Sequence, residues 1–326
     1  MQLSCNHQKV CRPVVCIVGP TASGKSDVAQ KLACMHSGEV ISADSMQIYR
    51  GMDIGTGKLT EEERKVKHWG LDLIDPGEPY SAALFQHYAR NCISDIDSRG
   101  LPVFLAGGTG LYVRATIDDY DFPREKQDPL LDEVRARYTQ YVDEHGQQAL
   151  WDRLYEQDPD SANLIHPHNT KRVIRAFEMM ELEGKRYVEQ HAGFSTMAQF
   201  VPAYIFELEV TPELLAERIN RRVDTMMKKG LLDEIVQLID AGFGDALTSR
   251  EAIGYKEFID PETNRLLSSE DIAQAVEQVK TASRRYAKRQ RTWWRNDERV
   301  IRIPADDADV DRIAREIDSI LASKEW

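Results

Sequence analysis

One stretch of the sequence predicts phosphate binding. It is Gly19-Pro20-Thr21-Ala22-Ser23-Gly24-Lys25-Ser26. The stretch follows an apolar run at 14–18 and precedes a helical pattern, the context that a P-loop requires. Its glycines let the backbone wrap an oligophosphate, so that amide groups and the helix N-terminus point at the anion. Lys25 adds a cation, and the Ser26 hydroxyl suits Mg²⁺. The motif does not specify the phosphate compound.

A carboxylate and a glycine-rich turn follow two further predicted strands. Residues 40–43 end at Asp44, and residues 101–106 run into Gly107-Gly108-Thr109-Gly110. Ligands of parallel α/β sheets bind beyond the carboxyl ends of strands, so Asp44 is expected near the phosphate loop, unless it only caps the next turn. The glycine turn is either a second backbone cradle or a tight packing turn. No Asp follows this strand, although P-loop ATPases usually hold Mg²⁺ with one.

Two predicted helices place basic side chains on one face. Lys171 and Arg175 are four residues apart, with Arg172 adjoining, and either contact phosphate or RNA or form a solvated face. Arg218 and Arg222 are one turn apart and either clamp a phosphate together or form surface ion pairs.

A basic and aromatic stripe lies between residues 278 and 295, where no acidic residue occurs. Tyr286, Trp293 and Trp294 are interleaved with the basic side chains, a pattern typical of nucleic-acid binding. The alternative is a solvated helix face with the tryptophan pair in the core. The basic residues are Lys280, Arg284, Arg285, Lys288, Arg289, Arg291 and Arg295.

Composition limits the class of protein. The formal net charge of −12 argues against indiscriminate nucleic-acid binding, but it permits a local basic surface. Five cysteines without paired C-x-x-C spacing argue against a zinc site and against a disulfide framework. No apolar run is long enough to cross a membrane, and the first residues lack the apolar region of a signal peptide. We therefore expect a cytoplasmic protein, with a monomer as the default.

The order of patterns predicts an α/β fold, a P-loop NTPase-like parallel sheet flanked by helices. Strands are expected at 14–18, 40–43, 101–106 and 204–210, and helices at 60–67, at 81–96 and near the end of the chain, where Val310, Ile313, Ile317 and Ile320 have helical spacing. Between 119 and 200 only helical patterns occur, which predicts an all-helical insertion domain. The core is then formed by 10–118 plus 201–326.

Taken together, these motifs resemble those of the tRNA dimethylallyltransferase family. Two positions depart from the family pattern, Leu59 in place of a frequent proline and His168 in place of asparagine, and they put only the local loop shape in doubt. The zinc-finger tail of some eukaryotic members is absent. The matching segments, in order, are GPTASGKS (19–26), DSMQIYRGMDIGTGK (44–58), GGTGLY (107–112), HPHNTKRVIRAFE (166–178), RINRRVDTMMKKGLLDE (218–234), AIGYKE (252–257) and AKRQRTWWR (287–295).

The resemblance implies transfer of a dimethylallyl group from its diphosphate to N6 of the adenosine 3′-adjacent to the anticodon. Asp44 then matches the general base, while Thr21 through Ser26 and Arg222 bind the diphosphate, with Mg²⁺ on Ser26. The catalytic residues implied are Asp44, Thr21 and Arg222. An adenine amine can reach such a base only if the nucleotide leaves the loop stack.

The partner implied is the anticodon stem-loop of tRNA, whose splayed bases suit sequence-specific recognition. The RNA-binding residues implied are Asp44, Ser45, Met46, Gln47, Thr109, Lys171, Arg172, Val173, Ile174, Arg175, Glu251, Ala252, Ile253, Gly254, Tyr255, Lys256, Arg284, Arg285, Lys288 and Arg289.

Two alternatives stay open from the sequence. One is an adenylate isopentenyltransferase that uses a free nucleotide, against which the helical insertion and the basic stripe speak. The other is a P-loop kinase or an RNA-binding NTPase, against which the missing strand-end Asp speaks.

Overall fold

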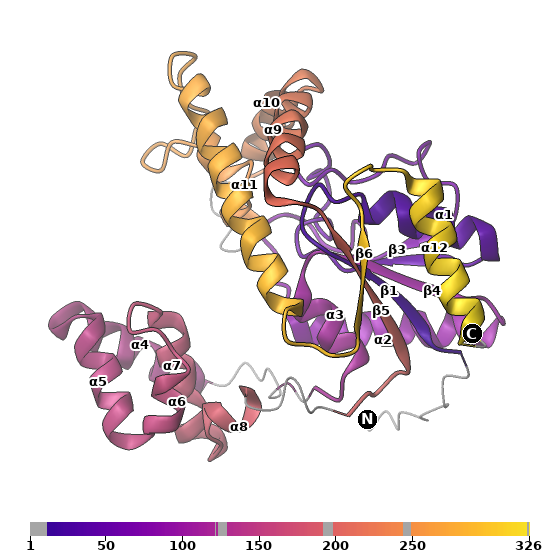
Figure 1. The fold of residues 1–326 in the computed structure, drawn as a ribbon. Helices are drawn as coiled ribbons and strands as arrows, with labels where there is room; N and C mark the ends of the chain where they lie inside the picture. The colour runs from indigo at the N-terminus through magenta and orange to yellow at the C-terminus, as the bar shows by residue number, and fades with distance from the viewer. Residues whose placement is uncertain (1–11, 121, 123–128, 192–197, 244–248, 325) are drawn as a thin grey trace. The chain divides into compact units, whose positions relative to one another are not determined.

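The chain forms two compact units in the computed structural model, which describes residues 12–120, 122, 129–191, 198–243, 249–324 and 326 (Figure 1). The first, called here the α/β unit, contains Met1–Asp119 and Gln199–Trp326. The second, the helical unit, is Tyr120–Ala198. Within the α/β unit the chain leaves and returns at adjacent points, because the carbonyl of Ile117 accepts hydrogen bonds from the amides of Phe200 (2.8 Å) and Val201 (3.1 Å).

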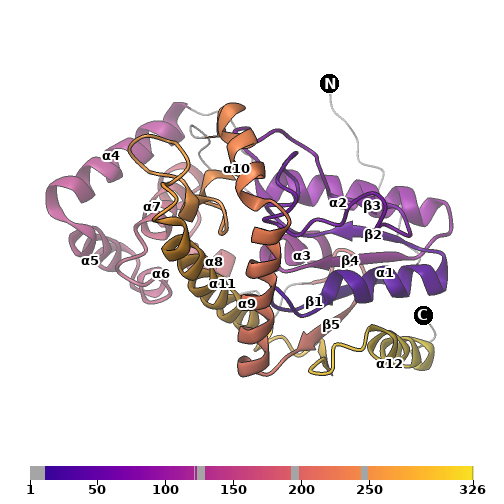
Figure 2. The same cartoon turned by 90° about the horizontal axis from the view of Figure 1, so that it is seen from above.

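A six-stranded sheet forms the centre of the α/β unit, in the order β3-β2-β4-β1-β5-β6. All neighbouring strands pair in parallel, and Figure 2 shows them from β3 at the top to β5 at the bottom. The prediction of a parallel α/β sheet is confirmed, whereas the two edge strands β3 and β6 were not predicted. The strands are β1 (Val14–Val18), β2 (Glu39–Ser42), β3 (His68–Trp69), β4 (Val103–Gly107), β5 (Ala203–Glu209) and β6 (Val300–Pro304).

Helices cover both faces of this sheet because β1 is apolar on both sides, as a central parallel strand must be. Val15 and Ile17 pack with α1 and α12, while Val14, Cys16 and Val18 pack with α2 and α3. The helices of the α/β unit are α1 (Lys25–His36), α2 (Ala82–Ser98), α3 (Gly110–Ile117), α9 (Pro212–Lys228), α10 (Leu231–Asp240), α11 (Ile272–Trp294) and α12 (Val310–Ser323), with short 3-10 turns η3 (Ser249–Glu251) and η4 (Lys256–Phe258).

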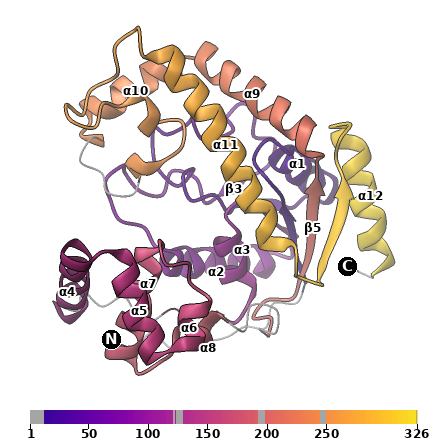
Figure 3. The same cartoon turned by 60° about the vertical axis from the view of Figure 1, so that its left-hand side comes forward.

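A second core lies under α9, α10 and α11, with α9 and α11 side by side (Figure 3). Buried residues of the 48–52 loop and of 252–259 complete it. The helix predicted at 60–67 is wrong. Thr60 and Glu63 bond reciprocally as in a helix start, but they close only a turn. The chain then extends so that the carbonyl of Lys67 accepts from the amide of Val40, which leads into β3.

The described residues of the helical unit form helices and turns around their own apolar core. Leu150, Leu154, Val173 and Phe177 are fully buried within it. Its elements are α4 (Pro129–His145), α5 (Gln147–Gln157), α6 (Pro159–Asn163), α7 (Thr170–Glu178), the π-helix η1 (Met179–Glu183) and α8 (Tyr187–His191).

The described part of the chain contains neither a membrane-spanning helix nor a disulfide bond. None of the helices in these ranges is long and apolar enough to cross a bilayer. Cys16, Cys34 and Cys92 are free, and burial raises the pKa of the Cys16 and Cys92 thiols. The buried pair therefore serves as small apolar side chains.

Candidate active site

The loop between β1 and α1 has the backbone of an anion cradle. Gly19, Ala22 and Gly24 have φ angles of 142°, 63° and 91°, and Gly24 directly precedes the first turn of α1. The hydroxyl of Ser23 is buried, and none of the described residues forms a hydrogen bond with it. Because buried polar groups are normally paired, this orphaned hydroxyl fits a loop built around an anionic ligand.

A hydrogen bond from the ammonium group fixes the side chain of Lys25 against this loop. Its Nζ donates a hydrogen bond to the carbonyl of Pro20 at 2.8 Å. Burial lowers the pKa of Lys25 from 10.5 to about 8, an effect that nearby Arg222 reinforces and nearby Asp44 opposes. An anion in the cradle would favour the charged ammonium and raise this pKa again.

Asp44 follows β2 at the carboxyl edge of the sheet and is half-buried. Its Oδ1 accepts a hydrogen bond from the amide of Met46 at 2.9 Å, while the amide of Ser45 donates to the hydroxyl of Thr109 at 3.1 Å. The two alternatives from the sequence therefore coexist, since Asp44 stabilises the next turn and also faces the cavity described below.

The glycine turn after β4 is tightly packed, and its Gly107 and Gly108 also line the cavity described below, so the two alternatives from the sequence are compatible. A Cβ at Gly107 would lie 2.1 Å from the carbonyl oxygen of Ala43. A Cβ at Gly108 would lie 2.1 Å from Nε2 of Gln290. A side chain at Gly107 would collide with the backbone of Ala43, whereas a side chain at Gly108 would displace the amide group of Gln290.

Arg222 and Arg218 point to different parts of the molecule, so the predicted joint phosphate clamp is wrong. Arg222 donates to the carbonyl of Thr56 at 2.8 Å, and burial lowers its pKa while Asp44 opposes the shift. Arg218 donates to the carbonyls of Ala305 and Asp306, which follow β6. Only Arg222 faces the phosphate loop's cavity.

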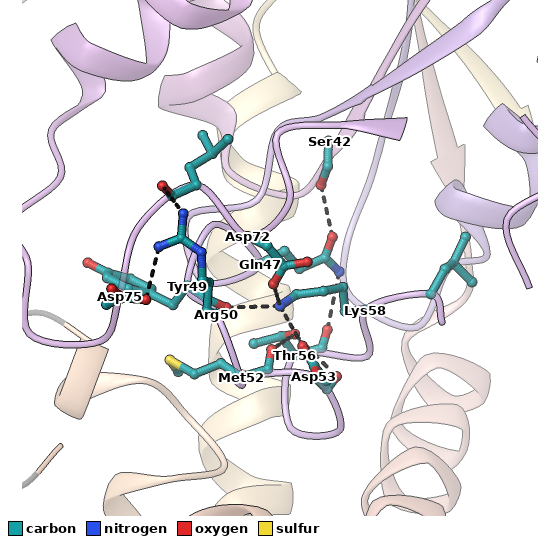
Figure 4. A network of polar contacts seen from close by, with 12 residues as sticks. Ser42, Gln47, Tyr49, Arg50, Met52, Asp53, Thr56, Lys58, Asp72 and Asp75 are labelled. Atoms are coloured by element: carbon teal, nitrogen blue, oxygen red, sulfur yellow. Dashed lines mark hydrogen bonds and ion pairs between the residues drawn. The ribbon is translucent and has the colours of Figure 1, made fainter. Parts of the chain in front are cut away.

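The 44–58 segment is fixed by a polar network on one side (Figure 4). Lys58, whose side chain is 2% exposed, donates to the carbonyl of Tyr49 at 2.9 Å and to the carboxylates of Asp53 (2.5 Å) and Asp72 (2.6 Å). Each of its three protons thus has an acceptor, as a buried ammonium requires.

Glu234 of α10 also fixes the same segment. Its carboxylate accepts from three consecutive amides, those of Asp53 (3.1 Å), Ile54 (2.7 Å) and Gly55 (3.2 Å). The hydroxyl of Tyr255 donates to it at 2.7 Å. This anchoring holds the loop whose next carbonyl, that of Thr56, binds Arg222.

A cavity of about 470 Å³ opens among these elements, within the size range of small-molecule sites. The wall formed by Ile219, Val223 and Met226 of α9 with Val279 of α11 is apolar, and the phosphate-loop side is polar. The residues predicted from the sequence that line it are Thr21, Lys25, Ser26, Asp44, Ser45, Met46, Gln47, Arg222, Glu251, Ala252, Ile253, Gly254, Lys256, Arg285 and Arg289.

Several predicted contact residues lie elsewhere. The side chain of Tyr255 is fully buried, and Arg284 donates to Asn220 at 2.7 Å and to Thr281 at 2.9 Å. Trp294 is 1% exposed and packs in the core of the α/β unit, which agrees with the second alternative from the sequence, a tryptophan pair in the core. Trp293 packs against the same core. Lys288 is exposed and does not line the cavity.

The basic face predicted on α7 belongs to the helical unit. Lys171 and Arg172 are exposed, whereas Arg175 pairs with Glu178 and Glu183, each at 3.1 Å. Val173 is fully buried in the unit's core, so its side chain is not on the predicted RNA-contacting surface.

Two cavity residues on α11 were not assigned to the site from the sequence. Burial raises the pKa of Tyr286 to about 12, and the charge of Asp44 adds to the shift. Gln290, which is 4% exposed, contacts both the phosphate loop and the glycine turn. The available signal was the spacing of Gln290, which places it on the same helix side as Ala287 and Trp294. This spacing does not reveal its hydrogen-bond partners, because they are far away in the sequence.

Two family models match the chain: IPP transferase over residues 47–297 and isopentenyl transferase over residues 12–68. A relative from Halalkalibacterium halodurans named tRNA dimethylallyltransferase is 43% identical over 312 residues, which are 95% of this chain and 97% of the relative. A relative of the same name from Bacillus subtilis is 43% identical over 290 residues, 89% of this chain and 90% of that one.

Solved structures show the same similarity. The tRNA isopentenylpyrophosphate transferase from Bacillus halodurans matches with a TM-score of 0.67 and 40% identity, covering 96% of both chains. A eukaryotic dimethylallyltransferase acting on tRNA matches with a TM-score of 0.79 and 27% identity, over 96% of this chain and 79% of that one.

Proposed function

Because the chain belongs to the IPP transferase family, we propose that it is a tRNA dimethylallyltransferase. It transfers a dimethylallyl group from dimethylallyl diphosphate to N6 of the adenosine 3′-adjacent to the anticodon, and it releases diphosphate. The observation that supports this most is that Asp44, Lys25 and Arg222 line one cavity.

The cradle supports the departure of the leaving group. When the bond between the dimethylallyl carbon and the diphosphate oxygen breaks, the electron pair stays on diphosphate, whose charge increases. Amide groups of the phosphate loop with Lys25 and Arg222 are already oriented before the reaction, so they stabilise this charge without reorganisation. Thr21 lines the cavity beside them and completes the diphosphate site.

Asp44 would accept the proton of the nucleophile. The amine lone pair of adenine N6 forms the new bond to carbon, and one N6 proton passes to the Asp44 carboxylate as positive charge develops on nitrogen. The adenine has to leave the loop stack to enter the cavity. The Met46 amide bond keeps one carboxylate oxygen oriented while the nucleotide binds.

Mg²⁺ fits the donor set through Ser26, whose exposed hydroxyl lines the cavity in the first turn of α1. In the described ranges no cluster of three His, Cys, Asp or Glu could hold a metal by itself. Protein Mg²⁺ sites of this kind use one or two side chains and substrate phosphate oxygens, so Ser26 and the diphosphate would share the ion. The ion would supply further positive charge to the leaving group.

For RNA binding, we propose that Arg285 and Arg289 contact tRNA phosphates at the cavity and that the Glu251-to-Lys256 turn contacts the anticodon loop. Lys171 and Arg172 are the exposed cations through which the helical unit would contact tRNA. A monomeric state and a cytoplasmic location stay predictions.

One assay separates this function from its alternatives. The protein is incubated with labelled dimethylallyl diphosphate and either unmodified tRNA or AMP as the acceptor. Label on tRNA supports the proposal, and label on AMP alone supports an adenylate isopentenyltransferase. Label on neither, together with NTP turnover, supports a P-loop kinase or NTPase.

A further inference from the structure

One side chain of α11, that of Gln290, joins the phosphate loop to the glycine turn after β4. Its Oε1 accepts a hydrogen bond from the amide of Thr21 at 2.8 Å, and its Nε2 donates to the carbonyl of Gly108 at 2.9 Å. The residue is 4% exposed, and its bond to Gly108 is buried while its bond to Thr21 is partly buried. Water therefore has little access to compete for the amide group of Gln290.

The amide group of Gln290 fits against the glycine turn because Gly108 has no side chain. A Cβ at Gly108 would lie 2.1 Å from Nε2 of Gln290, and Gly108 has no left-handed backbone angle that would itself require glycine. The close approach to Gln290 is therefore the contact that a larger residue would break.

The bond to Thr21 acts on the part of the loop that faces the ligand. Thr21 lines the cavity, and its amide is fixed by Gln290. The same helix contributes Tyr286, one turn before Gln290, and Arg285 and Arg289 to the cavity wall. Gln290 therefore fixes the phosphate loop to the helix that carries the cations proposed for RNA.

We propose that Gln290 is a positioning residue that orients Thr21 and the phosphate loop relative to α11. The diphosphate, held by the loop, and the acceptor, held by α11, are then correctly placed for transfer. This inference rests on the proposed function. It assigns to Gln290 no contact with substrate, and it predicts an effect on the transfer step and on diphosphate binding but not on RNA affinity.

The test uses Gln290→Met, which keeps the length of the side chain but removes both hydrogen bonds. Gln274→Met is the matched control, because Gln274 is an exposed glutamine on the same helix. Transfer rate at saturating substrates, KM for tRNA, affinity for inorganic diphosphate and the thermal midpoint are measured for both variants and for the unsubstituted protein. We expect Gln290→Met to lower the transfer rate about 10- to 100-fold, as a displacement of about 1 Å does.

The remaining readouts separate positioning from packing. Diphosphate affinity should fall and the KM for tRNA should stay unchanged, while Gln274→Met matches the unsubstituted protein in every readout. A normal transfer rate at saturating substrates in Gln290→Met, whether the KM for tRNA rises or stays unchanged, would overturn the inference.

Two further controls keep the test decisive. If Gln290→Met does not fold, Gly108→Ala displaces the same amide from the opposite side, and an unchanged rate in that folded variant overturns the inference. Failure of the unsubstituted protein to label tRNA would instead refute the proposed function.

Discussion

The carboxylate of Asp44 accepts a hydrogen bond from the amide of Met46, two residues later and 2.9 Å away. This bond uses Oδ1, and an asparagine at the same position offers an equivalent carbonyl oxygen. A substitution of Asp44 by asparagine therefore separates its two roles, stabilising the turn and accepting the proton.

Replacing Asp44 by asparagine should lower the transfer rate by about 10²- to 10⁴-fold, because the amide cannot take the N6 proton. The turn is retained, so tRNA affinity should stay close to normal. Single-turnover transfer and equilibrium tRNA binding measure the two effects. A variant that lost tRNA binding in step with activity would show that Asp44 acts through the loop's shape.

Lys25 should make diphosphate binding dependent on pH. Since burial lowers its pKa to about 8, the ammonium of the free protein loses its proton above that pH. Bound diphosphate favours the charged form, so binding near pH 9 should take up about one proton and binding near pH 7 about none. Calorimetry in buffers of different ionisation enthalpy measures this uptake. Lys25→Met should abolish it, and persistence of the uptake in that variant would assign it to another group.

The same lowered pKa has a consequence for folding. Between about pH 8 and 10.5 the unfolded chain binds more protons at Lys25 than the folded chain does. Lys25 alone therefore makes the folded state more stable as pH rises through this window.

Arg285 and Arg289 should carry part of the salt dependence of tRNA binding. Both are exposed and line the cavity, so replacing both with alanine should reduce the slope of log K against log salt by about two. Arg315→Ala on α12 removes an exposed arginine that does not line the cavity and should leave the slope unchanged. Identical slopes in all three proteins would place the RNA elsewhere.

Glu234→Ala should weaken both the fold and the diphosphate site. Three backbone amides and the Tyr255 hydroxyl lose their acceptor, at a cost of about 1–3 kcal/mol in the free energy of unfolding. The loop then no longer holds Arg222, and the KM for dimethylallyl diphosphate should rise. Asp233→Ala controls for the loss of an acid in the first turn of α10. Equal effects of the two substitutions would refute the anchoring role.

Local patterns were enough to predict the phosphate loop, the central strands and the strand-end position of Asp44. They were insufficient where a short element depends on a distant partner. β3 has only two residues and therefore no pattern of its own, and it forms by pairing with β2. β6 contains Val300, Ile301 and Ile303 but is short and ends in Pro304, and it forms by pairing with β5.

The stripe on α11 shows a second limit. Ala287, Gln290 and Trp294 are spaced three and four residues apart and form the buried side of the helix. Helical spacing allowed the interpretation that the tryptophans are buried, but the surrounding basic residues favoured an exposed stacking surface for them. The hydrogen bonds of Gln290 cross 269 and 182 residues, and no local pattern encodes such partners.

The carbonyl of Ile117 closes the α/β unit at the point where the chain leaves it, since the amides of Phe200 and Val201 both bind there, and Asp118 pairs with Gln199 in an antiparallel bridge. The helical unit is therefore an insertion whose two ends are joined within the α/β unit. Because every strand of the sheet lies outside the insertion, a helical unit of different length or sequence could replace it without the loss of a strand.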